Sequence, residues 1–315
     1  MKKFLVTGGA GFIGSHIVDA LVKKGYFVRV LDNFSNGKKE NLKGSLDKIE
    51  LVRGDIRSLD TCLKAAKGID FILHQAALRS VPKSFLNPAE YNEVNIQGTL
   101  NLLKAALKNK TKSFVFASSS SVYGDVHNFP EKENFTPQPI SPYALTKLTA
   151  EYYCRMFSHR YGLATVSLRY FNVFGPRQAV DDEYAVVIPK FISCMLKDKH
   201  PPIFGNGRQS RDFTYVANVV EANLLAAKKP GCSGGVFNIA GGRDYSILEL
   251  VGILNKLMHQ NIKPIFLNPR AGDVFKTQAD LAAARRSLGF KPSVGFLCGL
   301  KLTIKYFLSP ELQKP

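Results

Sequence analysis

The stretch VTGGAGFIGSH, residues 6–16, decides the fold. It completes an apolar run, KFLVTG, that predicts a β-strand, and it opens SHIVDALVKK, whose apolar residues recur at helical spacing. Gly8, Gly11 and Gly14 stand three residues apart. Small residues are needed there for a tight turn, for close approach of a pyrophosphate to backbone N–H groups, and for packing of the helix on the strand. Strand, glycine turn and helix in this order predict a dinucleotide site.

An acidic residue follows at the expected distance. Asp32 ends the next β-rich run, YFVRVLD, 18 residues beyond Gly14. A carboxylate there accepts hydrogen bonds from the adenosine ribose and repels a 2′-phosphate, so NAD is favoured over NADP. A glycine turn that binds nothing is the alternative, and Asp32 disfavours it. Asp55, in RGDIRS, is a candidate for holding the adenine edge, and it is equally suited to an ordinary helix N-cap.

Short β-rich runs alternate with amphipathic helical patterns up to about residue 170. The runs are KFLVTG, YFVRVLD, IELVRGD, IDFILHQ, KSFVFAS and ATVSLRYF. Such alternation requires crossover connections and predicts an α/β fold, a doubly wound parallel (Rossmann) sheet, with a smaller C-terminal substrate lobe. We expect the NAD-binding domain to comprise residues 1–172 plus about 213–240, where helix and strand return to the main sheet. The nucleotide-sugar lobe is expected to comprise 173–212 plus 241–315.

Composition excludes several classes of protein. The chain of 315 residues is 45% hydrophobic, which favours a folded, globular protein. Its five cysteines are far apart and in no metal-ligand spacing, so neither disulfides nor a metal site are predicted, and a reduced, cytoplasmic location is expected. No apolar run reaches the length of a membrane span. The net charge of +18 attracts polyanions, but the basic residues are scattered without interleaved aromatics, so specific nucleic-acid binding is not expected.

Two further stretches carry chemistry. FASSSSVYGD, residues 116–125, ends an apolar run in four serines, at the carboxyl edge where such sheets bind ligands. SPYALTK, residues 141–147, places Tyr143 and Lys147 on one face of a helix. An ammonium beside a phenol favours the phenolate, so we expect the pKa of Tyr143 to be lowered and the residue to act as a base. A surface pair without function is the alternative. His74 is interpreted as a core histidine.

In its ordered motifs the chain resembles the extended short-chain dehydrogenases/reductases, most closely the UDP-galactose and UDP-N-acetylglucosamine 4-epimerases. The motifs are TGGAGFIG, DN at 32–33, GDI, HQAA, SSSSVYG, SPYALTK, LRYFNVFGPRQ, SRDF and RAGDV. The resemblance implies that Ser119, Tyr143 and Lys147 are catalytic. It also implies a set of cofactor contacts, which are Gly8, Gly11, Phe12, Ile13, Gly14, Asp32, Asn33, Asn36, Gly37, Asp55, Ile56, Gln75, Ala76, Ala77, Arg79, Asn95, Ser118, Tyr143, Lys147 and Tyr170.

The same resemblance assigns the substrate site. Its residues are Ser119, Ser120, Tyr143, Asn172, Val187, Ile203, Phe204, Arg211, Arg270, Asp273 and Thr277. Within it, arginines suit the diphosphate because their forked donors bind phosphate bidentately. Thr277 stands where relatives restricted to plain hexoses carry tyrosine, so an N-acetyl group is expected to fit. UDP-GlcNAc/UDP-GalNAc is therefore the first choice, with UDP-Glc/UDP-Gal also accepted.

The implied reaction is an epimerisation through a transient 4-keto sugar, with NAD bound tightly and regenerated in each turnover. In related 4,6-dehydratases an Asp and a Glu follow the catalytic hydroxyl, whereas Ser120 and Ser121 stand here. Serines cannot replace the carboxylic acids that elimination uses, so a dehydratase or uronate decarboxylase is disfavoured. Arg79 keeps UDP-glucuronate 4-epimerisation open. A non-catalytic NAD-binding scaffold is the remote alternative. The family also suggests a homodimer formed by helices at 90–108 and 141–161.

Overall fold

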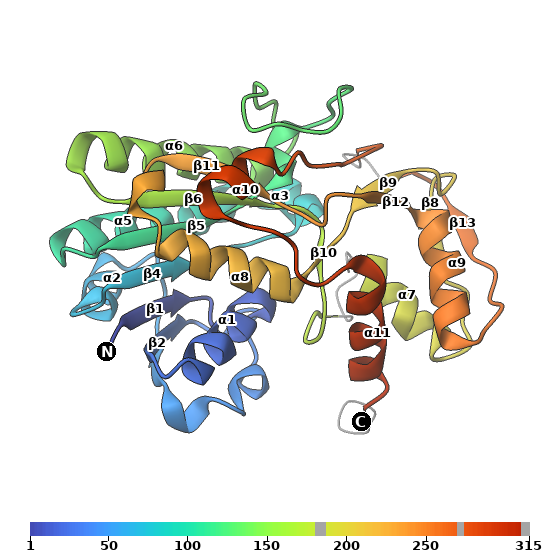
Figure 1. Cartoon of the computed structure of the whole chain (residues 1–315), viewed down its shortest axis with the longest axis horizontal. Coiled ribbons are helices and arrows are strands. Elements are labelled where there is room, and N and C mark those ends of the chain that lie inside the picture. Colours follow the sequence, from blue (N-terminus) through green and yellow to red (C-terminus); the bar gives the residue numbers. More distant parts are fainter. Residues whose placement is uncertain (180–186, 270–273, 310–315) are drawn as a thin grey trace.

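A parallel sheet forms the body of the molecule (Figure 1). The computed structural model describes residues 1–179, 187–269 and 274–309. The sheet has seven strands in the order β11-β6-β5-β4-β1-β2-β3, and every neighbouring pair is parallel. Its strands are β1 (Lys3–Thr7), β2 (Phe27–Asp32), β3 (Glu50–Arg53), β4 (Phe71–His74), β5 (Ser113–Ser119), β6 (Thr165–Tyr170) and β11 (Gly235–Ile239). The chain starts in the middle of the sheet and winds outward in both directions, which confirms the doubly wound fold.

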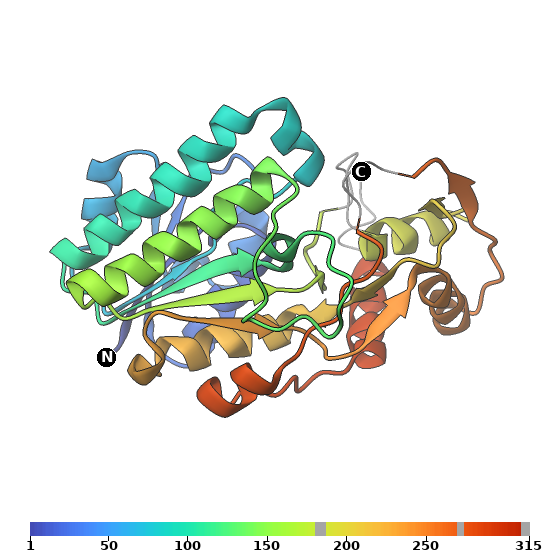
Figure 2. The same ribbon diagram turned by 90° about the horizontal axis from the view of Figure 1, so that it is seen from above.

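Helices cover both faces of the sheet, as Figure 2 shows. One face carries α2 (Leu59–Ala66), α5 (Gly98–Lys108) and α6 (Pro142–Tyr161), and the other carries α1 (Phe12–Lys23), α8 (Val216–Ala227) and α10 (Ala282–Leu288). Short helical segments connect them: α3 (Val81–Leu86), α4 (Pro88–Tyr91), the π-helical turn η3 (Asn92–Gln97), and the 3₁₀ turns η1 (Lys39–Leu42), η2 (Leu46–Lys48), η4 (Ser120–Tyr123) and η5 (Pro230–Cys232). Burial of alternate strand residues against each helical layer explains why the central strands are apolar on both sides.

A smaller lobe lies beyond the carboxyl ends of the strands (Figure 1). It contains α7 (Val187–Met195), α9 (Ile247–Met258), α11 (Phe296–Phe307) and the strand pairs β7 (Val173–Phe174) with β10 (Thr214–Tyr215), β9 (Ser210–Asp212) with β12 (Asp244–Ser246), and β8 (Pro202–Phe204) with β13 (Ile265–Leu267). An aromatic cluster fills its core, in which Phe296 stacks on Tyr245 and Phe213 at ring-centroid distances of 4.2 and 5.4 Å. This core is separate from those on the two faces of the sheet.

These cores depart from the expected division of the chain in two segments. Phe213, Tyr215 and Val216, which we expected in the NAD-binding domain, belong to the core of the smaller lobe. As predicted, the chain returns to the main sheet through α8 and β11. However, residues 279–290, which we expected in the smaller lobe, place Ala284 and Leu288 of α10 in the core between α8 and the sheet. α10 packs beside β11 because this buries its short apolar face, although the helix comes late in the sequence. The two-domain division as a whole stays a prediction.

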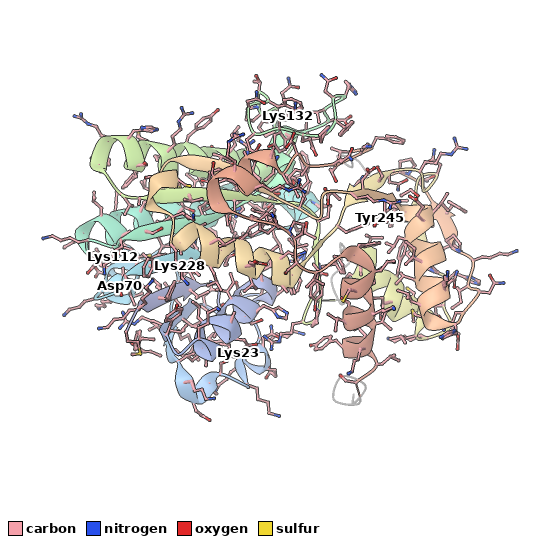
Figure 3. The ribbon with its side chains drawn as sticks, in the orientation of Figure 1. Lys23, Asp70, Lys112, Lys132, Lys228 and Tyr245 are labelled. Atoms are coloured by element: carbon pink, nitrogen blue, oxygen red, sulfur yellow. The ribbon has the colours of Figure 1, made fainter. Side chains whose placement is uncertain are left out.

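Positive charge is spread over the surface. Figure 3 labels lysines at separate places: Lys23 at the end of α1, Lys112 before β5, Lys132 in the loop after η4, and Lys228 at the end of α8. Lys112 pairs with Asp70 at 2.9 Å. Across the described residues, no helix is both long and apolar enough to span a bilayer, and no group of three or more His, Cys, Asp or Glu side chains is arranged to hold a metal. The five cysteines are free thiols.

Candidate active site

A cleft of about 2300 Å³ opens at the carboxyl edge of the sheet. It is lined by residues that end or follow β1, β2, β3, β4, β5 and β6, together with residues from the start of α6. All of the predicted cofactor residues except Asn95 line this cleft. Ser119, Ser120 and Asn172 of the predicted substrate site line it as well. Asn95 lies behind the wall, where its amide holds the backbone of Leu78 and the Thr146 hydroxyl at 2.9 to 3.0 Å.

The glycine turn is closed by contacts that leave no room for side chains. Gly8 has φ +66°, and a Cβ there would lie 2.7 Å from the backbone nitrogen of Ala76. A Cβ on Gly14 would lie 2.1 Å from the carbonyl oxygen of Gly8. α1 begins at Phe12 after Gly11, whose position provides no capping side chain, so the N–H groups of the first turn depend on the cleft for a partner. This end of α1 suits a diphosphate.

Two carboxylates mark the far end of the cleft. Asp32 accepts hydrogen bonds from the backbone N–H groups of Ala10 and Phe34 at 2.9 and 2.8 Å, which fix its carboxylate at the end of β2. Asp55 accepts hydrogen bonds from the guanidinium and the backbone N–H of Arg57 and from the amide of Asn33, and these bonds lower its pKa to about 2. The structure does not show Asp55 as a helix N-cap, because Ser58 caps α2. Asp55 is therefore an ionised acceptor facing the cleft.

The end of β4 carries a polar network. His74 is buried, with Thr7 and Thr99 hydroxyls on its two ring nitrogens at 2.7 and 2.9 Å. Burial lowers its pKa to about 3, so it is a neutral core histidine, as interpreted from the sequence. Beside it Gln75 accepts a hydrogen bond of 3.2 Å from Tyr170. Asn223 of α8 holds both residues.

Three predicted catalytic residues meet where β5 ends and α6 begins. Ser141 caps α6, which places Tyr143 in its first turn and Lys147 one turn later. Ser119 is the last residue of β5, and its hydroxyl interacts with Tyr143. Nζ of Lys147 donates to the backbone carbonyl of Ala117 at 2.8 Å and lies 5.0 Å from the centre of the Phe116 ring. All three line the cleft shared with the glycine turn.

The prediction that Lys147 lowers the pKa of Tyr143 is wrong. The pKa of Tyr143 is raised, because its burial outweighs the lowering by the Ser119 hydroxyl and the charge of Arg79. Burial also lowers the pKa of Lys147 to about 7, although Cys154 and Glu151 act in the opposite direction. Spacing along the helix indicates that two groups are neighbours, but it says nothing about the water that they lose on folding. The charge of Arg79 favours the phenolate of Tyr143.

Of the predicted substrate residues that the structure describes, some lie at the cleft wall or contact residues there through hydrogen bonds, and the others belong to the smaller lobe. Asn172, with φ +35°, lines the cleft and donates from its amide to the Thr277 hydroxyl at 2.9 Å. Thr277 is buried behind it and also accepts from the Asp212 N–H at 3.3 Å. The Arg211 guanidinium donates to the carbonyls of Ser210 and Phe275.

The remaining substrate positions belong to the smaller lobe. Ile203 is buried in its core, the carbonyl of Phe204 accepts from Gln209 at 2.6 Å, and Val187 starts α7 beside this core. Together with Arg211 and Thr277 they lie outside the lining of the cleft as described, and their contact with substrate stays a prediction. Arg270 and Asp273 fall outside the described residues.

Sequence reasoning missed many residues of the cleft wall, Arg177 and Gln178 among them. Arg177 and Gln178 line the cleft, and each has one buried polar atom without a partner among the described residues. Arg177 also pairs with Asp19 of α1 at 2.6 Å, and Gln178 donates to the carbonyl of Val173 at 2.9 Å. Both belong to the motif LRYFNVFGPRQ, which therefore marked the segment without showing which side chains turn inward.

Comparison with known proteins assigns the family. Residues 4–240 match the model of the NAD dependent epimerase/dehydratase family. The chain belongs to this family. It is similar to a UDP-N-acetylglucosamine 4-epimerase from Methanobrevibacter ruminantium, solved with UDP-N-acetylmuramic acid (42% identity, 98% of each chain, TM-score 0.93).

Two further structures show how widely this fold is shared. One is a UDP-glucose 4-epimerase from Thermotoga maritima, solved with UDP-glucose (40% identity, 97% of this chain and 98% of the other, TM-score 0.92). The other is a UDP-glucuronic acid 4-epimerase from Bacillus cereus, solved with UDP-glucuronic acid and NAD (35% identity, 96% of this chain and 98% of the other, TM-score 0.89). The suspected relation to extended short-chain dehydrogenases/reductases is thereby confirmed.

Proposed function

We propose that this family member is an isomerase, an NAD-dependent UDP-hexose 4-epimerase that works through a transient 4-keto sugar. One observation carries the proposal: Ser119, Tyr143 and Lys147 line the same cleft as the glycine turn and Asp32. A hydroxyl, a phenol and an ammonium are thus placed beside a site that suits a dinucleotide. The uncapped N–H groups of α1 fit its diphosphate, and the fixed Asp32 carboxylate fits the ribose.

Each residue has a chemical role. Tyr143 takes the proton from O4 of the sugar and returns it after the ring has turned over, while Ser119 hydrogen-bonds the same oxygen. Lys147 holds the cofactor ribose through its ammonium group. NAD, when bound, would supply the hydride acceptor for C4 and would allow the hydride to return to the opposite face, so that no net oxidation occurs. Because the pKa of Tyr143 is raised by burial, additional positive charge in the cleft is needed for the phenolate to form at neutral pH.

Loss of water or carbon dioxide is disfavoured at this site. Ser120 and Ser121 form the 3₁₀ turn after β5, and both line the cleft at the positions where related dehydratases carry carboxylic acids. The Ser119 hydroxyl bonds the hydroxyl and the N–H of Ser121 at 3.1 and 3.2 Å. The carboxylates nearest in the sequence, Asp125 and Glu131, do not line this cleft, so its wall is neutral and polar at Ser120 and Ser121. Such a wall supports proton exchange at O4 without elimination.

For the substrate, UDP-GlcNAc/UDP-GalNAc is our first choice, with UDP-Glc/UDP-Gal also accepted. Thr277 is a small residue, and its hydroxyl holds Asn172 at the cleft wall. The relative of M. ruminantium, a UDP-GlcNAc 4-epimerase, supports this choice. UDP-glucuronate is the second candidate, because the exposed Arg79 lines the cleft and brings a cation that suits a carboxylate.

A homodimer formed by α6 and its neighbours is also proposed. α6 exposes Leu145, Tyr152 and Met156 at 47 to 57%, and the adjacent α3 exposes Phe85 and Leu86. These residues form an apolar stripe on the described surface that a second copy would cover. Sedimentation of the purified chain at twice the monomer mass would support this arrangement.

The test of the proposed function needs no added cofactor. The purified chain is incubated with UDP-GlcNAc, UDP-Glc and UDP-GlcA separately, and the sugars are followed by NMR. We expect the C4 epimer to form from UDP-GlcNAc fastest, without accumulation of a keto product. A 4-keto-6-deoxy sugar or a pentose would instead assign a dehydratase or a decarboxylase. No conversion with NAD added would leave the scaffold hypothesis.

A further inference from the structure

A buried ion pair lies directly behind the catalytic residues and has no part in the reaction described above. Glu151 of α6 and Arg169 of β6 are each 4% exposed in their side chains. The guanidinium binds the carboxylate bidentately, with Nε to Oε1 at 2.9 Å and Nη2 to Oε2 at 2.8 Å. Charges are rarely buried without a partner, and such a pair is costly compared with apolar side chains of similar volume. Its presence here therefore calls for a function beyond stability.

The pair connects β5 to α6 at the point where the catalytic residues meet. Ser118 donates its hydroxyl hydrogen bond to Oε1 of Glu151. Its neighbours on β5 also contact α6: the carbonyl of Ala117 accepts from Lys147, and the Ser119 hydroxyl interacts with Tyr143. Three successive residues of the strand thus contact three residues of the helix that follow one another at spacings of four. A shift of Ser118 would move both catalytic contacts.

The register of the sheet explains why Arg169 holds this position. Ser118 of β5 is paired with Arg169 of β6, and side chains at paired positions point to the same face of a sheet. Phe116, two residues before Ser118, shares that face and lies under the ammonium of Lys147. The Arg169 guanidinium is itself stacked 4.6 Å from the centre of the Tyr123 ring. The carboxylate of Glu151 is therefore held by the Ser118 hydroxyl on one side and by the Arg169 guanidinium on the other.

We propose that Glu151, held by Arg169, is a positioning residue for the catalytic set: it fixes Ser118, and hence Ser119, against α6, and it adds a negative charge to the surroundings of Lys147. This inference rests on the proposed function, in which Lys147 acts as a cation. Glu151 touches neither substrate nor cofactor in this arrangement. It acts through Ser118 and Lys147.

The charged and titratable groups around Glu151 and Lys147 determine the direction in which loss of Glu151 shifts the pKa of Lys147. Lys147 and Cys154 lie on α6 with Glu151, Arg169 faces it from β6, and Glu133 acts on Arg169 from the loop after η4. His74, which lies near Lys147, is neutral at pH 7 because burial lowers its pKa. Tyr123 is also neutral, since burial raises its pKa.

Loss of the Glu151 charge would leave Arg169 without the carboxylate that binds its guanidinium. Because Glu151 now raises the pKa of Lys147, its loss would lower that pKa. Lys147 would then lose its proton at a lower pH. The alkaline side of the activity profile would follow it.

The test compares Glu151→Gln with the wild type and with Glu133→Gln as a matched control. Glu133 also interacts with the charge of Arg169, but it binds the N–H of Asn238 and not Ser118. Two quantities are measured: the pH dependence of kcat, and the titration of Lys147 by NMR of the chain labelled with ¹³C at the lysine Cε carbons, with Lys147→Met assigning the resonance. We expect Glu151→Gln to shift both midpoints downward by about one pH unit, the size typical of a close charge. Glu133→Gln should leave the Lys147 titration in place.

The outcomes separate this inference from the proposed function. An unchanged Lys147 titration with kcat lowered equally at every pH would overturn the inference, because Glu151 would then be structural alone. If the wild type converts no UDP-sugar, the proposed function fails, and the Lys147 titration still decides whether Glu151 controls that ammonium. If Glu151→Gln does not fold, the double variant Glu151→Gln/Arg169→Met removes the uncompensated buried charge. In it, a downward shift of the Lys147 midpoint supports the inference and an unchanged midpoint contradicts it.

Discussion

Lys147 of α6 donates a hydrogen bond of 2.8 Å to the backbone carbonyl of Ala117 in β5, so α6 is fixed to the strand that carries Ser119. Replacing Lys147 by Met would leave that carbonyl without its donor but would remove an ammonium whose pKa burial lowers to about 7. These effects on stability oppose each other, since an unsatisfied buried acceptor costs about 1–3 kcal/mol. We expect Lys147→Met to keep its Tm within a few degrees and to lose epimerisation at least 100-fold. A folded variant with wild-type turnover would exclude a catalytic role for Lys147.

Removal of the Tyr143 hydroxyl tests the base directly. Tyr143→Phe keeps the ring in place and removes the only atom that we assign to proton transfer at O4. Because general acid–base catalysis contributes about 10²–10⁴-fold, kcat should fall by that factor. NAD content and Tm, measured in the same preparations, should stay at wild-type values. Turnover within tenfold of the wild type would mean that another group takes the proton.

The glycine turn makes a sharp prediction about cofactor retention. A methyl group on Gly14 would lie 2.1 Å from the Gly8 carbonyl, whereas one on Gly252 of α9 meets nothing within 4 Å. Gly14→Ala should therefore abolish copurification of NAD, measured from the absorbance of the denatured protein. Gly252→Ala should retain the cofactor fully and be slightly more stable, because alanine favours the helix by roughly 1 kcal/mol. Equal NAD content in the two variants would contradict a dinucleotide site at this turn.

Glu131 makes stability depend on pH. Its side chain is buried, and burial raises its pKa to about 8. The folded chain then holds a proton that the unfolded chain releases above about pH 4.5, so this group stabilises the fold at low pH and less so as the pH rises to 8. Glu131→Gln removes this loss of stability at higher pH. Each unit by which the pKa is raised corresponds to about 1.4 kcal/mol of folding free energy.

We therefore expect Glu131→Gln to raise Tm at pH 8 and to leave it nearly unchanged at pH 5, as measured by calorimetry between pH 5 and 9. Asp212 has its pKa raised to about 7, also by burial, so part of the pH dependence should remain in the variant. Parallel Tm curves for the two proteins would show that Glu131 is ionised in the fold.

Thr277 tests the choice of sugar. Its buried hydroxyl accepts from Asn172 at 2.9 Å, so a tyrosine there would push Asn172 into the cleft. We expect Thr277→Tyr to lower kcat/KM for UDP-GlcNAc relative to UDP-Glc by roughly tenfold or more, a typical effect of pocket size. Thr277→Val, which keeps the volume and loses only the hydroxyl, is the control and should change this ratio little. A ratio unaffected by tyrosine would remove Thr277 from the determinants of specificity.

The sequence predicts the sheet and the dinucleotide end of the cleft well because their determinants are local. Gly8, Gly14 and Asp32 follow strands whose order is set by crossover connections, so their meeting at one edge is dictated by topology. Tyr143 and Lys147 share a helix face for the same kind of reason. Each of these relations depends on spacing within one element or on the connection between two.

Other features depend on contacts between distant segments, which spacing does not encode. The pKa of Tyr143 is raised because the fold removes its water. Thr277 supports Asn172 from 105 residues away, and the position of Arg211 against backbone carbonyls is set by β9 and the segment containing Phe275. The pairing of Glu151 with Arg169 is likewise set by the register of β5 with β6, which the spacing of residues along α6 does not indicate.

The central claim is that hydride leaves C4 and returns to it inside one cleft. The most direct measurement incubates the purified protein with UDP-GlcNAc in D₂O, without added cofactor, and reads the C4 position of both epimers by NMR. We predict conversion to the C4 epimer with the original hydrogen retained at C4, because a hydride held on the cofactor does not exchange with solvent. Deuterium at C4 of the product would contradict the claim, since it would show that the carbon is epimerised by proton exchange.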